Sequence, residues 1–325
     1  MSEPRNHHYL PQFYLRHFAD KDERLFQYEK AVTTRAIPTM VSNSGSQRDY
    51  HTIDVVDNPP DRASVESRLS NIESQQNVVL NDVLQNPEIA SRRHDELVDF
   101  VVLMYHRTPP FKEAIEQQLS STVKATARLM LRNGRFPPPP DSVKKLIQER
   151  GDDIFEIEIN NWKLLEMMFD NAAHSQMRGI LRSMKWRIRK VEAPNVSLVT
   201  SDTPVVLFDR DHDPKSPYGK GFACPSVEVS LPLSGQLLLE FSHSGFDDDG
   251  TLTPELVRHY NRRMIIASSR FIFGPTASEE LLADIPALCS QKAGFSFSTI
   301  DFPKGSYFIS KITPVTNEHL RICQP

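Results

Sequence analysis

The sequence is poor in cysteine and has no long apolar run. Its three cysteines, Cys224, Cys289 and Cys323, are far apart and odd in number, which indicates a reducing compartment and excludes a CxxC zinc or redox pair. Mean hydropathy is −0.43, and no stretch approaches the roughly 18 apolar residues of a membrane helix. The first residues contain no apolar core of a secretory signal. We therefore expect a soluble cytoplasmic protein with no part in a membrane.

Standard catalytic signatures are also missing. The chain contains no GxSxG elbow, P-loop, GxGxxG, HExxH or zinc-finger spacing. An active site would therefore have to be assembled from distant segments. A net charge of −4 and a pI near 6.3 argue against a protein that coats nucleic acid non-specifically, although not against a local basic cleft.

The most unusual stretch lies near the start, where residues 6–18 read NHHYLPQFYLRHF. Proline fits the first turn of a helix, so we predict a short helix from about Pro11 to Phe18. Leu10, Tyr14 and Phe18 are spaced by four, with Leu15 beside them, and this spacing predicts one buried stripe.

A second stripe of the same helix carries His8, Gln12 and Arg16. Two interpretations stay open. The polar side chains could satisfy carbonyl groups while the aromatic residues anchor the chain terminus. Alternatively, they could line a cleft that holds an anion or a reacting group.

The opening stretch resembles the N-terminal signature of the DUF4238 family, which reads approximately HxYxPxxYLxxF. The segments Tyr28-Glu29-Lys30 and Ser201-Asp202-Thr203-Pro204-Val205 fit later parts of the family pattern, and the resemblance spans residues 7 to about 275. The family has no assigned activity. The resemblance therefore supports the architecture and the choice of residues, and it implies no reaction.

Helical periodicity dominates the middle of the chain. We predict helices at about 62–85, 95–107, 112–133, 141–150 and 160–184. In the first of these, Glu66 and Glu73 are two turns apart, or about 10.5 Å along the axis. Such carboxylates are usually solvated, and they gain interest only if their face turns toward His8 and Arg16.

Three further polar features have both a structural and a functional interpretation. Arg107 in the last turn of its helix could complement the helix dipole or face an acidic ligand. Asp202 at a strand end could be catalytic or could make a local Asx-turn. Lys185 to Val191 alternates like a strand, with Arg187 and Arg189 pointing outward, and this basic face is either solvated or meets phosphates.

The fold class that we predict is α+β, in one continuous unit from residue 1 to 325. A helical middle, residues 62–184, packs on a mostly antiparallel sheet built from residues 24–37 and 185–313. Thr253 and Pro254 predict a helix start, residues 264–273 a strand, and residues 295–302 and 307–312 a hairpin.

Two functional hypotheses follow. The first is a hydrolase that acts on an anionic substrate, most plausibly a phosphodiester in a nucleotide or nucleic acid, with a divalent metal as a possible cofactor. Its candidate residues are His8, Gln12, Glu73 and Asp202 for catalysis, Arg16, Lys30, Arg107 and Asn261 for substrate binding, and Glu66, Glu73 and Asp202 for a metal. The second is a non-catalytic binding or regulatory module, in which the same residues form a structural network. The sequence does not indicate an oligomeric state.

Overall fold

A six-stranded sheet forms the centre of the body in the computed structural model, which describes residues 5–32, 35–53, 59–135, 138, 140–150, 171–211, 219–302 and 305–321. The inner strands pair antiparallel, and the two short edge strands pair parallel to their neighbours. The strands in spatial order are β10 (Thr251–Leu252), β5 (Lys185–Val191), β9 (Leu237–Ser242), β8 (Val227–Pro232), β7 (Val206–Asp209) and β14 (Val315–Thr316).

A second, four-stranded sheet joins the beginning of the chain to its end. It contains β3 (Ile37–Met40), β2 (Arg24–Glu29), β11 (Phe271–Gly274) and β6 (Thr200–Ser201), all antiparallel. Tyr28 of β2 lies opposite Ile272 of β11. The expectation that early strands pair with late ones is thus confirmed, although the chain forms two larger sheets rather than one.

The helices confirm the predicted helical middle and the α+β class. The element starting after Thr253 is also a helix, capped by the Thr253 side chain on the Leu256 N–H. Residues 160–170 of the last middle helix lie outside the described residues. The longer helices are α2 (Ser64–Gln85), α3 (His94–His106), α4 (Pro109–Arg132), α5 (Asp141–Arg150), α7 (Asn171–Ser183), α8 (Pro254–Ala267) and α9 (Glu279–Leu288), and α10 (Asn317–Arg321) follows near the end.

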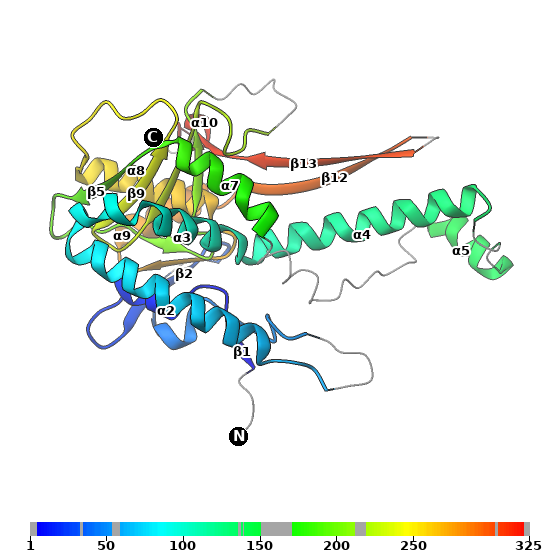
Figure 1. The fold of residues 1–325 in the computed structure, drawn as a ribbon, viewed down its shortest axis with the longest axis horizontal. Helices are drawn as coiled ribbons and strands as arrows, with labels where there is room; N and C mark the ends of the chain where they lie inside the picture. Colours follow the sequence, from blue (N-terminus) through cyan, green and yellow to red (C-terminus); the bar gives the residue numbers. More distant parts are fainter. Residues whose placement is uncertain are drawn as a thin grey trace.

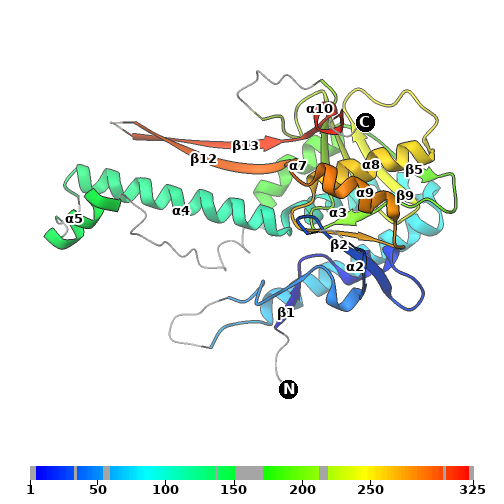
Figure 2. The same ribbon diagram turned by 180° about the vertical axis from the view of Figure 1, so that it is seen from behind.

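Helices cover both faces of the central sheet (Figures 1 and 2). Every residue of β9 is buried. Leu239 and Phe241 share a core with α3 and α7, whereas Leu238 packs with Val257 and Tyr260 of α8. This alternation, which follows from the two-residue repeat of a strand, places α8 on the face opposite α3.

The strand predicted over residues 264–273 is wrong. Helix α8 continues to Ala267, and only Phe271–Gly274 are extended. The run Met-Ile-Ile-Ala is apolar in a way that fits a buried helix as well as a strand, so periodicity could not separate them.

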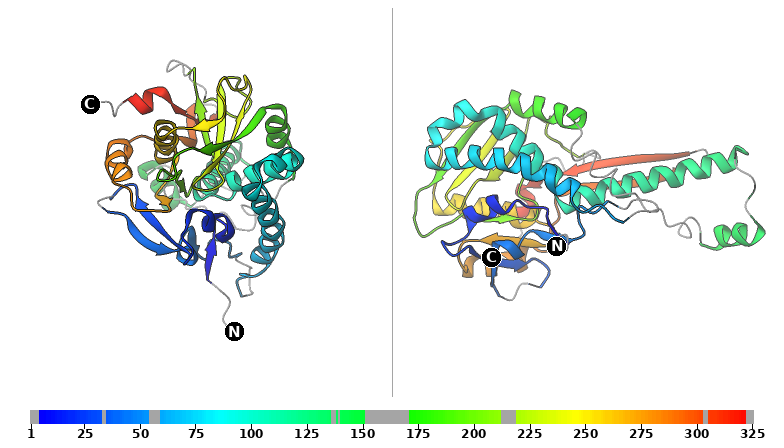
Figure 3. Two further views of the ribbon diagram at one scale, coloured as in Figure 1. Left: turned by 90° about the vertical axis from the view of Figure 1, so that its left-hand side faces the viewer. Right: turned by 60° about the horizontal axis from the view of Figure 1, so that its bottom comes forward.

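An arm leaves the body beside the sheet. Helix α4 and the hairpin of β12 (Gly294–Phe302) and β13 (Gly305–Thr313) extend side by side, with α5 at the far end (Figures 1 and 3). The predicted hairpin is confirmed, and its turn residues 303–304 lie outside the described residues.

The opening helix is anchored by its buried stripe. Helix α1 (Gln12–Leu15) continues as a 3-10 turn, Arg16–Phe18, and Leu10, Tyr14, Leu15 and Phe18 are fully buried, as predicted. The Tyr14 hydroxyl lies 2.7 Å from Thr200 Oγ1 and donates to the carbonyl of Pro232 at 2.8 Å. The N-terminal segment is therefore fixed to both sheets by one phenol.

We expect Tyr14→Phe to lower the free energy of unfolding by about 1–3 kcal/mol, because it leaves a buried carbonyl and hydroxyl without their partner. Urea unfolding would measure the loss. Tyr105→Phe is the control, since that half-buried phenol makes no hydrogen bond within the described residues. Equal losses in the two variants would contradict the anchoring role.

Candidate functional site

A polar groove separates the opening segment from α2. Its volume is about 360 Å³. The polar stripe of the opening helix and the face of α2 that carries Glu66 and Glu73 lie opposite each other across it, because α1 buries its aromatic side and turns its polar edge toward α2. The polar lining residues are His8, Gln12 and Arg16 on one wall and Glu66, Ser70, Glu73, Ser74 and Asn77 on the other.

His8 is held as a neutral ring. It ends the short strand β1 (Asn6–His8), which pairs with β4 (Ser46–Arg48). Its Nε2 lies 3.1 Å from the carbonyl oxygen of Ser42, so this nitrogen carries the proton. Burial lowers the pKa of His8, against the opposing charges of Glu66 and Glu73. At neutral pH the unprotonated nitrogen is therefore Nδ1. The amide nitrogen of Gln12 lies 3.5 Å from Nδ1 and 3.4 Å from Nε2.

Arg16 lies at the rim of the groove. Its Nε donates to Glu23 at 2.8 Å, and almost half of each side chain is exposed. Such surface pairs contribute roughly 0–1 kcal/mol. Arg16 can therefore exchange Glu23 for an anion at little cost.

Arg107 lies beneath the groove and is completely buried. Its guanidinium donates to Glu73 at 2.8 Å and to the carbonyl of His8 at 2.7 Å. Its own carbonyl accepts the Tyr50 hydroxyl at 3.1 Å. Arg107 caps the C-terminal end of α3, where its structural interpretation places it. The acid that it pairs with belongs to the protein and not to a ligand.

Two further histidines, His7 and His51, lie beside Glu66. His51 Nδ1 is 2.5 Å from Glu66 Oε1, and the His51 ring stacks on His7 at 5.5 Å between centroids. Burial lowers the pKa of His51 to about 4, so the ring is neutral and donates through Nδ1. Burial raises the pKa of Glu66, but the hydrogen bond from His51, together with the electrostatic effects of His51, His7 and Arg107, makes the net shift downward. Sequence reasoning missed His7 and His51, and the loop position of His51 gave no periodic signal.

His7, His51 and Glu66 bring possible metal ligand atoms within 4.8 Å of one another. Ligand atoms around one zinc ion lie roughly 3–3.5 Å apart. However, His7 Nδ1 accepts the backbone N–H of His51 at 2.8 Å, so its lone pair is already used within the protein. His51 Nε2, which has no partner among the described residues, and the Glu66 carboxylate are the two remaining ligands. This donor set does not fit a ready metal site.

Asp202 and Lys30 lie together at another place. The Asp202 carboxylate accepts the N–H groups of Ser269, Arg270 and Phe271 at 2.6–2.9 Å, and burial raises its pKa. Three amide donors explain why it stays at the turn between α8 and β11. The expectation that it joins His8, as a catalytic group or metal ligand, is not met.

Lys30 holds the same turn through its carbonyl groups. Its ammonium donates to the carbonyls of Ile266 at 2.9 Å, Ser268 at 2.8 Å and Gln291 at 3.3 Å. Burial lowers its pKa to about 8. Asn261 is likewise engaged with the backbone, since its amide binds the Val199 N–H and the Ser197 carbonyl. Neither residue lines the groove.

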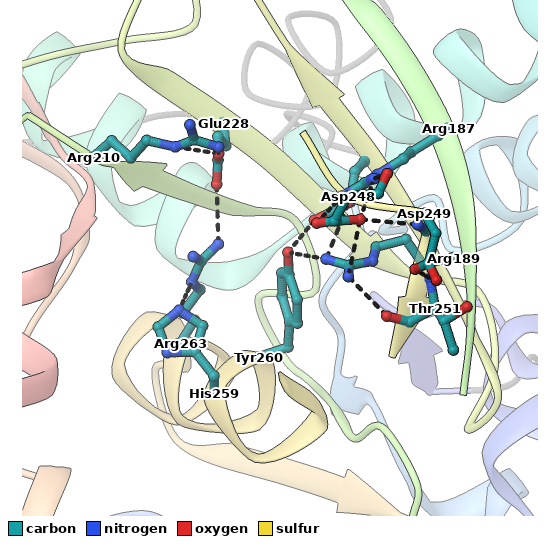
Figure 4. Close-up of polar contacts among 12 residues, drawn as sticks. Arg187, Arg189, Arg210, Glu228, Asp248, Asp249, Thr251, His259, Tyr260 and Arg263 are labelled. Carbon is teal, nitrogen blue, oxygen red and sulfur yellow. Dashed lines mark hydrogen bonds and ion pairs between the residues drawn. The ribbon is translucent and has the colours of Figure 1, made fainter. Parts of the chain in front are cut away.

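The basic face predicted for β5 is wrong. Arg189 is only 2% exposed. Arg187 and Arg189 both turn toward Asp248, which lies in the acidic loop of residues 247–249 (Figure 4). Arg187 also donates to the buried Glu240 at 2.9 Å, and Tyr260 bonds the same carboxylate. These cations are neutralised inside the protein, so they provide no phosphate-binding strand.

A family model described as a protein of unknown function (DUF4238) matches residues 6–278, which is most of the chain. The chain belongs to the DUF4238 family. No curated protein and no solved structure matches it. Within the described residues, every helix is too short or too polar to span a bilayer.

The three signature segments of this DUF4238 chain serve two regions. The first segment bounds the groove, while Lys30 and Asp202 from the other two hold the turn after α8. Tyr9 of the first segment is close enough to Asp202 to feel its charge. Burial raises the pKa of the Tyr9 phenol, and the charge of Asp202 raises it further. The signature residues therefore do not meet in one site: the first segment lines the groove, and the other two stabilise a turn elsewhere in the fold.

We expect Arg107→Met to lower the free energy of unfolding by about 1–3 kcal/mol, because it leaves the half-buried carboxylate of Glu73 and the carbonyl of His8 without their donor. The double variant Arg107→Met/Glu73→Met should recover part of this loss. Chemical denaturation of the four proteins in the cycle measures the coupling. A loss below about 1 kcal/mol, or strictly additive losses, would show that the pair does not hold the site.

The buried neutral His51 should make the protein sensitive to acid. The pKa of His51 is about 6.5 in the unfolded chain and about 4 in the folded protein. Between these two pH values, His51 binds a proton in the unfolded chain but not in the folded protein. The free energy of unfolding should therefore fall by roughly 3 kcal/mol between pH 7 and pH 4 from this group. His51→Gln should show a shallower slope in urea unfolding at the same pH values. Identical slopes would exclude a neutral His51.

Proposed function

We propose that this protein is a hydrolase that acts on an anionic ester, with a phosphodiester as the first substrate class to test. One observation carries the proposal: a neutral imidazole that is anchored through Nε2 on the Ser42 carbonyl lines a groove of about 360 Å³, and Nδ1 is its remaining basic nitrogen. Anchoring of one ring nitrogen so that the other acts as a base is the arrangement of general-base histidines.

In the proposed reaction, His8 Nδ1 takes a proton from a water molecule as the water oxygen bonds to the phosphorus of the ester. The bond from phosphorus to the leaving oxygen breaks, and the imidazolium returns the proton to that oxygen. The carboxylates of Glu66 and Glu73 favour the protonated ring, so they stabilise the imidazolium that forms. Arg16, released from Glu23, binds the anionic group of the substrate. Gln12 orients the ring edge or the water through its side-chain amide.

Arg107 acts in this proposal as a positioning residue. It fixes the carbonyl of His8 and the carboxylate of Glu73, and it never meets substrate, because it is fully buried. Lys30, Asp202 and Asn261 have no part in the reaction, since each is occupied by backbone groups away from the groove. The proposal uses no metal, because both oxygens of Asp202 and one oxygen each of Glu73 and Glu66 are engaged by protein donors.

A second candidate function, a non-catalytic binding or regulatory module, is favoured by one specific observation. Arg107 has zero exposure and is bound to α2, to β1 and, through its own carbonyl, to Tyr50. Such a core pins the N-terminal segment whether or not catalysis occurs. The two functions differ at the outer residues, which only the hydrolase uses.

The test compares His8→Ala and Arg16→Ala on a chromogenic phosphodiester such as bis(p-nitrophenyl) phosphate. We expect His8→Ala to lower kcat by about 100- to 10,000-fold and Arg16→Ala to act mainly on KM, with melting temperatures close to the wild type. The wild-type rate should fall in acid with a midpoint below pH 6.5, because the pKa of His8 is lowered. A chelator should leave the rate unchanged.

Arg24→Ala is the matched control, since Arg24 is an exposed arginine paired with Asp22 outside the groove. It should leave kcat, KM and melting unchanged. Absence of turnover in the wild type, or a large drop in melting for His8→Ala without any change in turnover, would support the binding module instead.

A further inference from the structure

A second cavity, of about 420 Å³, lies at the root of the arm. Three parts of the chain meet there: the turn after α8 at Ser268–Arg270, the first turn of α4 at Phe111, and the base of the hairpin at Phe295 and Ile312. It shares no lining residue with the groove between α1 and α2. Its volume is in the range of small-molecule sites.

The charged residues that line this cavity are all cations. They are Lys30, Arg270 and Lys292, and no carboxylate is among the lining residues. Lys30 contributes charge rather than a hydrogen bond, because its ammonium already donates to three carbonyls. Asp202, whose charge attracts Lys30, does not line the cavity, and its oxygens accept hydrogen bonds from backbone amides. An anion entering the cavity thus meets positive charge and no lining acid, and it competes only with Glu29 for Arg270 at the rim.

Donors for such an anion come from the rim. Lys292 is exposed. The Arg270 side chain is 65% exposed, and its contact with Glu29 uses Nε at 3.0 Å. The outer fork of a guanidinium suits carboxylate and phosphate oxygens. The guanidinium also lies 4.6 Å from the centre of the Phe271 ring, which limits its freedom.

The rest of the wall is apolar. Tyr105, Phe111 and Phe295 supply aromatic surface, and Val205 and Leu207 supply aliphatic surface. Binding sites for organic ligands combine such walls with a few placed polar groups. A bare inorganic anion would leave this surface uncovered, so the lining suits a ligand with an apolar part.

We infer that the cavity binds a small organic anion that joins a flat or alkyl body to one carboxylate, sulfonate or phosphate group. The anionic group lies at Arg270 and Lys292, and the body lies between Phe111 and Phe295. The hairpin supplies Phe295 and Ile312, and Lys292 lies just before it; all three follow residue 278, where the family match ends. That part of the wall sets which body fits, and a bound ligand fastens the hairpin to α4.

The test uses 1-anilinonaphthalene-8-sulfonate as the probe and measures its Kd by fluorescence titration on the full chain. The double variant Arg270→Gln/Lys292→Gln should weaken binding about tenfold, as expected for the loss of charge-assisted contacts. Lys21→Gln, a change at an exposed lysine away from the cavity, should bind like the wild type. So should His8→Ala, which keeps this result separate from the hydrolase proposal.

Cysteine alkylation locates the probe. Cys289 lines this cavity, and Cys224 lines a different pocket. Bound probe should slow iodoacetamide labelling of Cys289, measured peptide by peptide, and leave labelling of Cys224 unchanged. Protection of Cys224 instead, or unchanged affinity in the double variant, would overturn the assignment.

Competition then distinguishes two sources of the same chemistry. Displacement of the probe by decanoate indicates an alkyl carboxylate, and displacement by adenosine monophosphate indicates an aromatic phosphate. Either result supports the site. Equal displacement by decanol, which has the alkyl body but no charge, would show that the cations have no role and would contradict the inference.

Discussion

The burial of one guanidinium, that of Arg107, is the constraint on which the site depends. A fully buried cation is tolerated only when its hydrogen bonds are made within the protein. Arg107 meets most of this need with Glu73 of α2 and with the carbonyl of His8, whereas its Nε has no partner among the described residues. If the N-terminal segment moved away, the guanidinium would lose its hydrogen bond to the His8 carbonyl. Both walls of the groove are therefore held in place by the same guanidinium.

The polar residues divide by how fully the protein itself satisfies them. Lys30 and Asp202 are occupied by backbone carbonyls and amides on the two sides of one turn, so they stabilise the fold. His8 Nδ1, the Gln12 amide and the Arg16 guanidinium have only long or exposed contacts. Chemistry needs groups that can still bind something else, and those groups gather in the groove.

Local pattern was enough to predict most helices and the polar faces of two of them. Helical periodicity depends on the residues themselves, so the spacing of His8, Gln12 and Arg16 and that of Glu66 and Glu73 marked the sides that meet in the groove, although the sequence left open whether they meet. The sequence also predicted that early strands join late ones, but the late strand, Phe271–Gly274, is shorter than predicted.

Long-range partners were beyond the sequence. Nothing near Arg189 indicates that Asp248 folds over it, and nothing near Asp202 shows that three amides of the α8–β11 turn will reach it. His51 lies in a loop without periodicity, so its pairing with Glu66 could not be read. These contacts join residues more than a dozen positions apart, and tertiary packing alone determines them.

The most direct test of the account is the titration of His8 by nitrogen-15 NMR of the labelled imidazoles, assigned with His8→Gln. The account predicts the Nε2–H tautomer at neutral pH and a pKa below the ordinary histidine value of about 6.5, since burial lowers it. A pKa at or above that value, or a proton resident on Nδ1, would contradict the claim that a neutral base faces the groove.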